Sequence, residues 1–298
     1  MPEFLIRDLP QPEQRTSDQL FVFTMFESVA NRYFLPSRRH WNELDRSSGG
    51  YFNLTMTYRL DSHVFFDSFS GFYRPHFISS LAELLLQKAK GILWLVSHCK
   101  TSSHREDYVA ELSRFVKVDK FGKCSGLGVK NPCPYPGCPD DFIRQYRFYL
   151  AFENSFCRDY VTEKVYWALN NDVVPIVMGG ANYSRFLPPN SYLNVRDYLS
   201  PKALADHLLV LTHNETEYGK YFQWKLSGAT LWEQPNVLRP SSSSGWCKLC
   251  ETLHQPRRPG VRAPAVVHNI TDWWFRGQCH SFPMTDQLHA KRHPHFLK

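Results

Sequence analysis

Residues 146–164 read YRFYLAFENSFCRDYVTEK, and this stretch decides the fold. Its first seven residues form an aromatic-rich apolar run between polar residues, which predicts a buried strand over Tyr146–Phe152. The five residues that follow the stretch, VYWAL, have the apolar spacing of a helix, and Asp159 or Thr162 is placed to cap it. Another apolar run, Val173–Gly179, predicts the next strand. The stretch is therefore the polar turn of a strand–helix–strand unit, where parallel sheets bind anionic ligands.

Apolar runs on both sides of this unit predict further strands and helices. Because strands alternate with helices, we expect an α/β fold with parallel sheets. The loop Gly122–Asp141 holds three cysteines and several prolines, which predicts a disulfide-stapled loop, and residues 235–265 read as a loop-rich tail. The expected strands are 20–26, 51–60, 91–96, 116–119 and 192–195; the expected helices are 80–89, 103–115 with Ser102 or Ser103 as cap, and one that opens at Ser200–Pro201.

Length and composition indicate a globular protein of two ordinary domains, since the chain has 298 residues and 43% hydrophobic residues. Its formal net charge is +7, which suits an acidic ligand such as a nucleotide diphosphate-sugar, although the same charge would also keep a secreted protein soluble. The basic residues are scattered and form no nucleic-acid motif. The sequence contains neither a signal peptide nor an apolar run long enough to span a bilayer.

Eight cysteines and four N-x-S/T sequons point to the secretory pathway. The alternative for the cysteines is a zinc site built from Cys133-x4-Cys138 or Cys247-x2-Cys250 with a histidine. Neither pair is flanked by a second pair at zinc-finger spacing, which favours disulfides. The sequons lie at Asn53, Asn182, Asn214 and Asn269, and the remaining cysteines are Cys99, Cys124, Cys157 and Cys279.

FENS at 152–155, DYVTEK at 159–164 and VPIVMG at 174–179 occur in this order. They closely resemble the signature of the inverting α1,3/4-fucosyltransferases, which move fucose from GDP-fucose to a hydroxyl of N-acetylglucosamine. From the residues alone, an ordinary strand–helix turn is the alternative. The resemblance covers roughly residues 1–250 and is densest from 90 to 225. It implies a GT-B fold, in which two Rossmann-like domains face each other across a cleft.

The resemblance also implies a domain plan. We expect residues 1–88 to form an incomplete acceptor-side domain, residues 89–233 the GDP-fucose-binding domain, and residues 234–298 a disulfide-containing tail that crosses back onto the first. Phe4–Pro10 resembles the middle of the family's N-terminal domain, so the first strands are expected to be missing. Family members are type II Golgi membrane proteins with an N-terminal anchor and stem; neither is present here, and in the full-length form we expect that anchor and the lumenal side of the Golgi.

Inverting transfer is a single displacement that needs a base for the acceptor proton and positive charge for the leaving diphosphate. The sequence has no Asp-x-Asp pair for a metal. We therefore expect that no cofactor is required, with stimulation by Mn²⁺ left open, and that fixed basic residues supply the charge. Lys164, at the start of the helix, is the first. Arg105 is the second, because WLVSHC and Arg105 resemble the family's WVVSN…R…YY element, and a planar guanidinium suits two phosphate oxygens.

The same resemblance assigns the remaining donor-side residues. It implies that Glu163 contacts fucose hydroxyls and that Asn154 and Tyr160 line the nucleotide or sugar. Tyr58 lies in TYRLDSH at 57–63, which resembles the family's TYRRDSD element with a leucine and a histidine at two of its positions.

Glu27 is the expected general base. It ends an apolar run in FESVAN, which resembles the family's ESPxH or ESPxN element with valine in place of proline. A glutamate at a strand end is usually just exposed, and only the resemblance singles this one out. A working base needs a partly desolvated setting.

Cys99 and Cys157 each follow a strand of the same predicted sheet, and we hypothesise that they pair; the alternative is a free, buried Cys99. Cys247-Lys-Leu-Cys250 resembles the family's C-terminal CxxC, which implies a short disulfide. The SxC after residues 91–96 together with FENSxC resembles invertebrate and plant enzymes that act on the N-glycan core.

The expected function is an α1,3-fucosyltransferase that uses GDP-fucose and an N-glycan or glycoprotein acceptor, at the innermost N-acetylglucosamine. The nearest alternative is Lewis-type fucosylation of antennal N-acetyllactosamine. A non-catalytic nucleotide-sugar or glycan-binding protein is a second alternative, and a GT-B transferase that prefers UDP-sugars is a third.

Overall fold

The chain forms two compact units, neither of which is continuous in sequence. The first comprises Met1–Ser68, Cys157–Tyr160 and Pro240–His280, and the second comprises Phe69–Phe156, Val161–Arg239 and Ser281–Lys298. The element expected at residues 4–10 and the serine run 241–244 lie outside the described residues. A computed structural model describes residues 14, 16, 19–30, 51–66, 73–126, 132–133, 138–228, 230–238, 245–254, 267 and 269–292.

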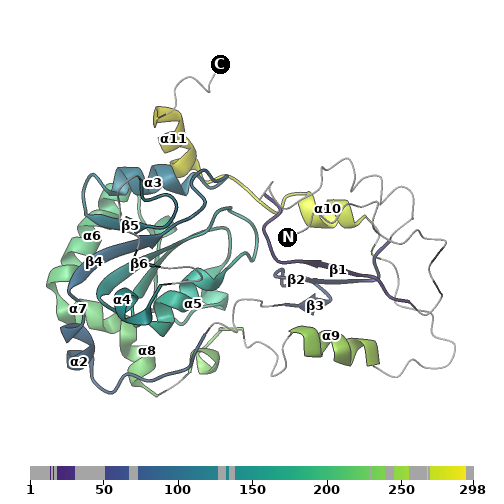
Figure 1. Ribbon diagram of the computed structural model, residues 1–298, viewed down its shortest axis with the longest axis horizontal. Helices are drawn as coiled ribbons and strands as arrows, with labels where there is room; N and C mark the ends of the chain where they lie inside the picture. The colour runs from purple at the N-terminus through teal and green to yellow at the C-terminus, as the bar shows by residue number, and fades with distance from the viewer. Residues whose placement is uncertain are drawn as a thin grey trace. The chain divides into compact units, whose positions relative to one another are not determined.

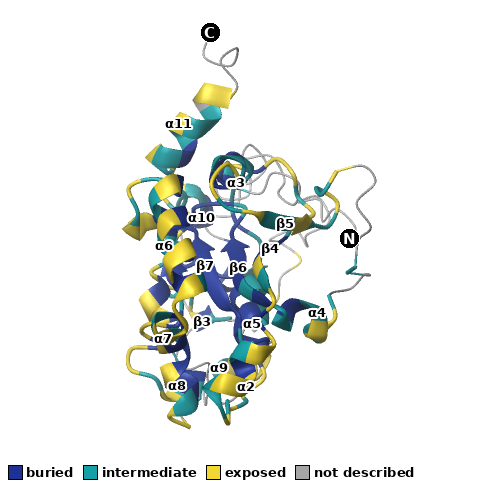
Figure 2. Ribbon diagram, turned by 90° about the vertical axis from the view of Figure 1, so that its left-hand side faces the viewer, coloured by how far each residue is buried: buried dark blue, intermediate teal, exposed yellow. Residues whose placement is uncertain are grey.

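The second unit is built on a five-stranded parallel sheet with the order β5-β4-β6-β7-β8. Figure 1 labels β4, β5 and β6 of this sheet. The two strands of the strand–helix–strand unit, β6 and β7, are almost wholly buried (Figure 2). Such continuous apolar strands are typical of a parallel sheet that is covered on both faces. The strands are β4 (Lys90–Leu95), β5 (Val118–Phe121), β6 (Tyr146–Phe152), β7 (Val174–Met178) and β8 (Leu193–Asn194).

Helices cover both faces of this sheet. Alternate residues of β4, β6 and β7 share one hydrophobic core with α3, α6 and α7, whereas α5 packs against β6 and β7 from the other face. No helix within the described ranges is both long and apolar enough to cross a membrane. The α-helices are α2 (Leu81–Leu86), α3 (Arg105–Leu112), α4 (Asp140–Arg144), α5 (Glu163–Asn170), α6 (Pro201–His213), α7 (Glu215–Gly219), α8 (Gln223–Leu226) and α11 (Pro283–Arg292); the 3₁₀ turns are η4 (Tyr183–Arg185), η5 (Val195–Asp197), η6 (Lys220–Phe222) and η7 (Leu231–Glu233).

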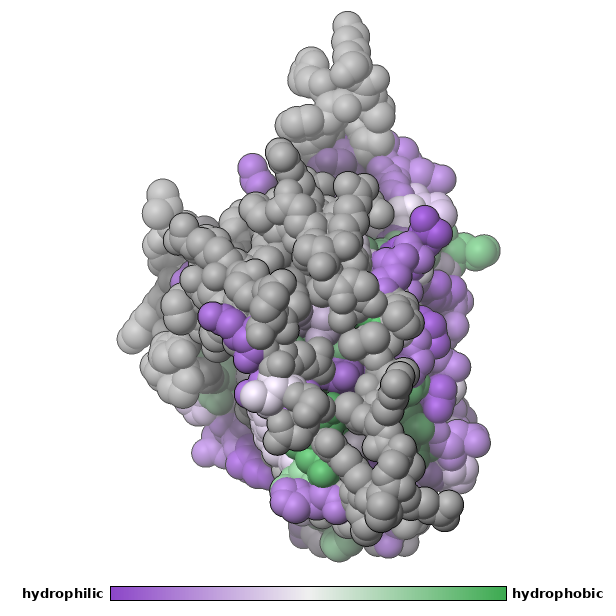
Figure 3. All heavy atoms as spheres, turned by 90° about the vertical axis from the view of Figure 1, so that its right-hand side faces the viewer, coloured by the Kyte–Doolittle hydropathy of each residue, from purple (hydrophilic) through white to green (hydrophobic). Residues whose placement is uncertain are grey.

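The first unit contains a three-stranded parallel sheet, β1-β2-β3, and two helices from the C-terminal tail. Its core packs Phe23, Tyr58 and Tyr160 against Trp274 of α10. The described residues on the face that Figure 3 views present both hydrophilic and hydrophobic surface. The elements are β1 (Val22–Met25), β2 (Leu54–Thr57), β3 (Val64–Phe65), α9 (Gly245–His254) and α10 (Ile270–Phe275).

Part of the tail lies in the same unit as the N-terminal residues, and the described residues of the tail include helices that the sequence did not predict. The tail contributes α9, α10 and α11. Anchoring apolar residues explain the difference: Ile270 and Trp274 are fully buried, and Asn269 caps α10 by accepting from the Asp272 backbone amide. The helix α2, which was placed before the expected domain boundary, belongs to the second unit.

Most expected elements are confirmed to within a few residues, but the cap of α3 is wrong. Its N-cap is His104, in a left-handed conformation with φ of 51°, and not Ser102 or Ser103. The reason is that the Ser103 hydroxyl donates to the backbone carbonyl of Glu153 at 2.8 Å, so it is used between loops rather than on its own helix. By contrast, Ser200 caps α6 with proline at the first position, as predicted.

A buried lysine lies just before β4, at the amino-terminal edge of the sheet. Lys88 is 6% exposed, and its ammonium donates to the carbonyls of Arg144 at 2.8 Å and Asn171 at 3.4 Å. Burial lowers the pKa of Lys88 to about 7, against the opposing attraction of Asp172. A lysine in the unfolded chain has a pKa near 10.4. Between about pH 7 and 10, Lys88 is therefore protonated in the unfolded chain but neutral in the folded protein.

Lys88 should therefore make the protein more stable as the pH rises from about 7 toward 10, because the unfolded state binds more protons there. Against a Lys88→Met variant, the wild-type free energy of unfolding should gain about 1 kcal/mol per pH unit in that window. Urea unfolding at pH 7, 8 and 9 measures it, with Lys202→Met, at an exposed ion pair, as control. Parallel pH profiles for wild type and Lys88→Met would contradict the lowered pKa.

Candidate functional site

The order of the sheet favours the carboxyl ends of β4 and β6 as the candidate ligand site. From β4 the chain passes to β5 on one side, and it then returns to β6 on the other side of β4. Open α/β sheets bind ligands outside the strand ends at such a reversal point. The helices α3 and α5 begin close after these two strand ends, so their N-termini add partial positive charge.

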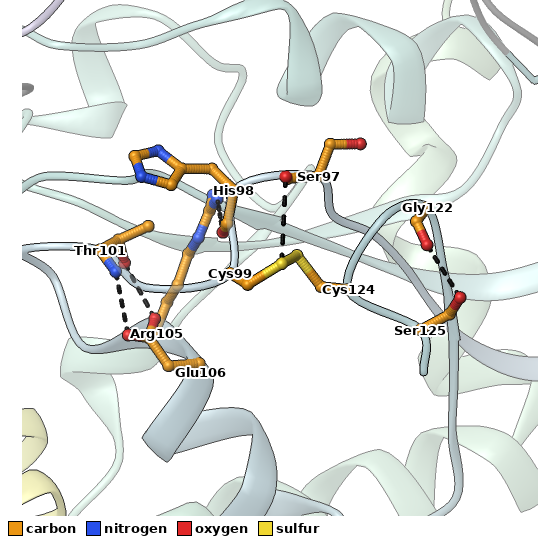
Figure 4. The surroundings of a disulfide bond; sticks show 9 residues. All are labelled: Ser97, His98, Cys99, Thr101, Arg105, Glu106, Gly122, Cys124 and Ser125. Carbon is orange, nitrogen blue, oxygen red and sulfur yellow. Dashed lines mark hydrogen bonds between the residues drawn. A yellow bond between two sulfur atoms is a disulfide. The ribbon is translucent and has the colours of Figure 1, made fainter. Parts of the chain in front are cut away.

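Arg105, in the first turn of α3, is held between these two strand ends. Its side chain is buried and donates to the backbone carbonyl of Phe152 at 2.5 Å. It also donates to the backbone carbonyl of His98 at 3.2 Å (Figure 4). Phe152 ends β6, and His98 follows β4. The two bonds fix the plane of a guanidinium, which suits the recognition of a phosphate.

The loops that follow the two strands are tied to each other. The backbone carbonyl of Asn154 accepts from the Ser103 amide and from the Ser102 hydroxyl, both at 3.2 Å. The side-chain carbonyl of Asn154 accepts from Ser155 Oγ at 2.9 Å. The Ser103 hydroxyl also donates to the backbone carbonyl of Glu153. These three hydrogen bonds from Ser102 and Ser103 therefore connect the residues just before α3 to the FENS turn.

A buried charge network lies at the start of α5. Glu153 is fully buried, and its carboxylate accepts from the Thr162 amide at 3.0 Å, the Thr162 hydroxyl at 2.9 Å and Lys164 Nζ at 3.1 Å. Lys164 also donates to Thr162 Oγ1 at 2.6 Å and lies 3.4 Å from a carboxylate oxygen of Glu163. Thr162 is the N-cap residue of α5, but its hydroxyl donates to the Glu153 carboxylate and makes no capping hydrogen bond to the helix.

The electrostatics of this network favour a charged Lys164. Burial by itself lowers the pKa of Lys164, but the carboxylates of Glu153 and Glu163 outweigh burial and raise it, while Arg105 opposes them. Burial raises the pKa of the Glu153 carboxyl, and the ammonium of Lys164 partly offsets this. The ammonium of Lys164 and the guanidinium of Arg105 therefore both lie near the carboxyl ends of β4 and β6, where their positive charge would favour an anion.

Gly179, directly after β7, makes room for this network. A methyl group on its Cα would overlap the hydroxyl of Tyr183 and lie 3.3 Å from Cγ of Glu153. Tyr183 and Glu153 are both buried, so neither can move aside without disturbing the core.

We expect Gly179→Ala to destabilise the protein by about 1–3 kcal/mol, because the added methyl overpacks the surroundings of Glu153. Gly91→Ala is the matched control, since a methyl at Gly91 meets no atom within 4 Å. Chemical denaturation of both variants measures the difference. Equal stability of the two would show that the backbone at Gly179 shifts at little cost.

In the first unit, a second group of predicted residues lies together around Glu27. The Tyr160 hydroxyl donates to Glu27 Oε2 at 3.2 Å, and the Tyr58 and Tyr160 rings pack at 4.9 Å between centroids. Burial raises the pKa of Tyr58 well above its usual range, and the charges of Glu27 and Asp159 add to the effect. The Tyr58 phenol is therefore neutral, and the Glu27 carboxylate that accepts from Tyr160 is only partly buried.

Asp159 connects this group to the loop after β2. It adopts a left-handed backbone conformation with φ of 59°, and its carboxylate accepts from the Leu60 amide at 3.2 Å. Arg59 next to it forms a two-pronged pair with Asp61, at 2.9 and 2.5 Å, and its guanidinium lies over the Trp273 ring. The histidine that departs from the family element, His63, accepts from the Thr55 amide at 3.1 Å within the sheet.

The predicted disulfide between Cys99 and Cys157 is wrong. Cys99 pairs with Cys124, at a Cα–Cα distance of 5.4 Å, and Cys157 pairs with Cys279 (Figure 4 shows the first). Cys99 follows β4 and Cys124 follows β5. Because β4 and β5 are neighbouring strands, the loops after them bring the two cysteines within disulfide distance. Cys157 belongs to the first unit, where the tail supplies its partner. Cys133 pairs with Cys138, as a disulfide-stapled loop requires.

The expected short disulfide between Cys247 and Cys250 is also contradicted, since neither sulfur is in a disulfide. Both residues lie in the regular helix α9. Positions three apart on a helix have Cβ atoms about 5–6 Å apart, whereas a disulfide needs about 3.5–4.5 Å.

Three of the four expected glycosylation sites are accessible. Asn182, Asn214 and Asn269 are exposed. Asn53 is 3% exposed, and its side-chain carbonyl accepts from the Phe21 amide at 3.0 Å. A bulky surface modification on Asn53 is incompatible with this fold, so its assignment was wrong.

Glu153, Thr162 and Asp159 were missed as site residues. The sequence did show a signal: Glu153 is a charged residue at the end of an apolar strand, and such a residue is seldom buried without a partner. Its partner Lys164 lies eleven positions later. Only the fold reveals that the two meet.

Two family profiles match the chain. The profile for glycosyltransferase family 10 (fucosyltransferase), C-terminal part, matches residues 85–273, and the profile for the N-terminal part of fucosyltransferases matches residues 3–68.

Among curated proteins, the chain is 35% identical over 285 residues to alpha-(1,3)-fucosyltransferase C of Drosophila melanogaster, covering 89% of this chain and 62% of that protein. It is 34% identical to glycoprotein 3-alpha-L-fucosyltransferase A of the same species (74% and 43%) and 36% identical to human alpha-(1,3)-fucosyltransferase 4 (88% and 46%). The chain thus spans about half the length of these relatives.

Among solved structures, the crystal structure of an alpha1,3-fucosyltransferase with GDP-fucose matches with a TM-score of 0.53 at 17% identity, covering 83% of this chain and 81% of that one. At this identity the likeness shows the fold alone. The α/β fold of GT-B type expected for the chain is confirmed by it and by the two parallel sheets.

Proposed function

Because the chain belongs to glycosyltransferase family 10, the fucosyltransferases, we propose that it transfers fucose from GDP-fucose to an N-acetylglucosamine hydroxyl with inversion. The observation that carries the proposal is the paired placement of Arg105 and Lys164 at the carboxyl ends of β4 and β6. A diphosphate is the kind of ligand that this arrangement of charge recognises.

In this proposal the donor leaves as GDP and its diphosphate gains negative charge. Arg105 and Lys164 stabilise that charge without having to rearrange, because backbone carbonyls hold the first and Glu153 holds the second. Glu163 and Asn154 lie on the same edge and are assigned to the sugar and nucleotide. No metal is needed for this step when two fixed cations neutralise the leaving group.

Glu27 is the proposed base that takes the proton of the acceptor hydroxyl as its oxygen attacks the anomeric carbon. The hydrogen bond from Tyr160 orients the carboxylate, and Tyr58 buttresses Tyr160 from the side. Tyr58 and Tyr160 are thereby positioning residues for the base in addition to the donor contacts that the family resemblance suggests.

The proposed acceptor is the innermost N-acetylglucosamine of N-glycans, with antennal N-acetyllactosamine as the second candidate. The relatives named above include a glycoprotein 3-alpha-L-fucosyltransferase, which favours a glycoprotein acceptor. Three disulfides and three exposed sequons support a Golgi lumenal location, with a membrane anchor in the full-length form.

Release of GDP from GDP-fucose by the purified protein tests the proposal, with a core N-glycopeptide and an N-acetyllactosamine oligosaccharide as alternative acceptors. Turnover that depends on the core glycopeptide is expected. Preference for the oligosaccharide would assign the second acceptor, and binding of GDP-fucose without turnover would instead identify a binding protein. Equal use of UDP-sugars would contradict the donor assignment.

A further inference from the structure

Two histidines and an aspartate converge where the C-terminal helix α11 meets α3. His104 is the N-cap of α3, Asp107 lies in its first turn, and His289 comes from the last turn of α11. Each offers one ligand atom, and the three atoms all lie within 4.8 Å of one another. No residue assigned to fucosyl transfer belongs to this cluster.

The detailed contacts make the cluster suitable for a cation. Asp107 is 2% exposed, and its Oδ2 lies 2.6 Å from His289 Nδ1. The rings of His104 and His289 stack at 3.9 Å between centroids. Nδ1 of His104 is buried and, within the part of the chain that the structure describes, has no hydrogen-bond partner. A buried nitrogen without a partner is costly, and a metal ion would satisfy it.

We propose that His104, Asp107 and His289 form a binding site for a first-row divalent cation of borderline softness, represented by Zn²⁺. Two imidazoles and one carboxylate are ligands that Zn²⁺ takes, with a fourth position left for water. Magnesium and calcium prefer sets made of oxygen atoms alone, so the donor set disfavours them.

Binding would require small changes that the site permits. Zinc–ligand bonds are about 2.0–2.2 Å, so the two rings must turn to bring their nitrogens onto one ion. The proton that His289 Nδ1 shares with Asp107 Oδ2 moves to Nε2, which leaves Nδ1 as a ligand. Arg292 pairs with the other carboxylate oxygen, Oδ1, at 3.1 Å, so it orients Asp107 without occupying Oδ2.

A bound ion would fasten α11 to the first turn of α3, one residue before Arg105. Without an ion, Asp107 is connected to α11 by its hydrogen bond with His289 and by its ion pair with Arg292. The two states predict different responses to added metal, because only a site that binds Zn²⁺ in the folded state raises the melting temperature with zinc concentration.

Calorimetric titration of EDTA-treated, desalted protein with Zn²⁺ tests the site, together with zinc X-ray absorption. The exposed thiols of α9 are an alternative zinc ligand set, so the titration is done in a Cys247→Ser/Cys250→Ser background. One zinc per chain, nitrogen and oxygen ligands without sulfur, and no binding of Mg²⁺ at the same concentration are expected.

His289→Ala and His104→Ala in that background should each weaken zinc binding at least about tenfold, since each removes one ligand. His213→Ala, an exposed histidine on α6, should leave it unchanged. Circular dichroism confirms that the variants are folded. Absence of binding, sulfur in the absorption spectrum, or an unchanged affinity in both His289→Ala and His104→Ala would overturn the proposal.

Discussion

Replacing Glu27 with glutamine is expected to lower kcat for fucosyl transfer by about 10²–10⁴-fold, with little change in GDP-fucose affinity. Glutamine retains the carbonyl that accepts the hydrogen bond from Tyr160, so the surrounding packing is preserved. It has no basic oxygen to take the acceptor proton. Steady-state GDP release with saturating acceptor, together with a separate measurement of GDP-fucose binding, separates the two quantities.

Two further variants test whether the loss of turnover in Glu27→Gln comes from the loss of the base. Tyr160→Phe keeps the ring against Tyr58 but removes the donor to Glu27, so a smaller loss in kcat, about tenfold, is expected. Glu217→Gln, at an exposed ion pair with Lys220, should retain wild-type turnover. If Glu27→Gln turned over as fast as wild type, the base would have to be another residue.

Replacing Lys164 with methionine should both abolish most turnover and destabilise the fold. The loss of a fixed cation at the leaving diphosphate is expected to cost about 10²–10³-fold in kcat. The fully buried Glu153 would also lose its counter-charge, and the removal of one partner from a buried pair costs about 3–5 kcal/mol. Turnover and denaturant unfolding of the same preparation measure both effects.

The double variant Lys164→Met/Glu153→Gln separates charge in catalysis from charge in folding. It removes both members of the buried pair, and the glutamine carbonyl can still accept from Thr162. We expect most of the lost stability to return while turnover stays low. Recovery of turnover together with stability would show that Lys164 serves the fold alone and that Arg105 suffices for the diphosphate.

The local elements of the second unit could be predicted because their signals are short-range. The run Tyr146–Phe152 forms β6 with the predicted bounds, and α5 follows it as the apolar spacing of VYWAL indicates. Ser200 and Pro201 specify the start of α6 by themselves. Each of these features depends on residues within one or two turns of each other.

What could not be predicted depends on contacts between distant parts of the chain. Cys99 follows β4, which has two neighbouring strands, and sequence alone does not say which neighbouring loop supplies its partner. Thr162 was predicted as a cap for α5, but the buried carboxylate of Glu153 takes the hydrogen bond of its hydroxyl instead. The cluster on α3 and α11 joins residues that are 182 positions apart.

The composition of the first unit has a consequence for biosynthesis. That unit needs Cys157–Tyr160 from the middle of the chain and Pro240–His280 from the tail, so it cannot be completed while the ribosome is still translating the segments between them. Cys279 is synthesised 122 residues after its disulfide partner Cys157. At 5–20 residues per second, this delay is roughly 6–24 s. During that interval the nascent chain exposes a thiol that can join a wrong cysteine, so a disulfide isomerase should accelerate maturation more than it would for a unit made of one continuous segment.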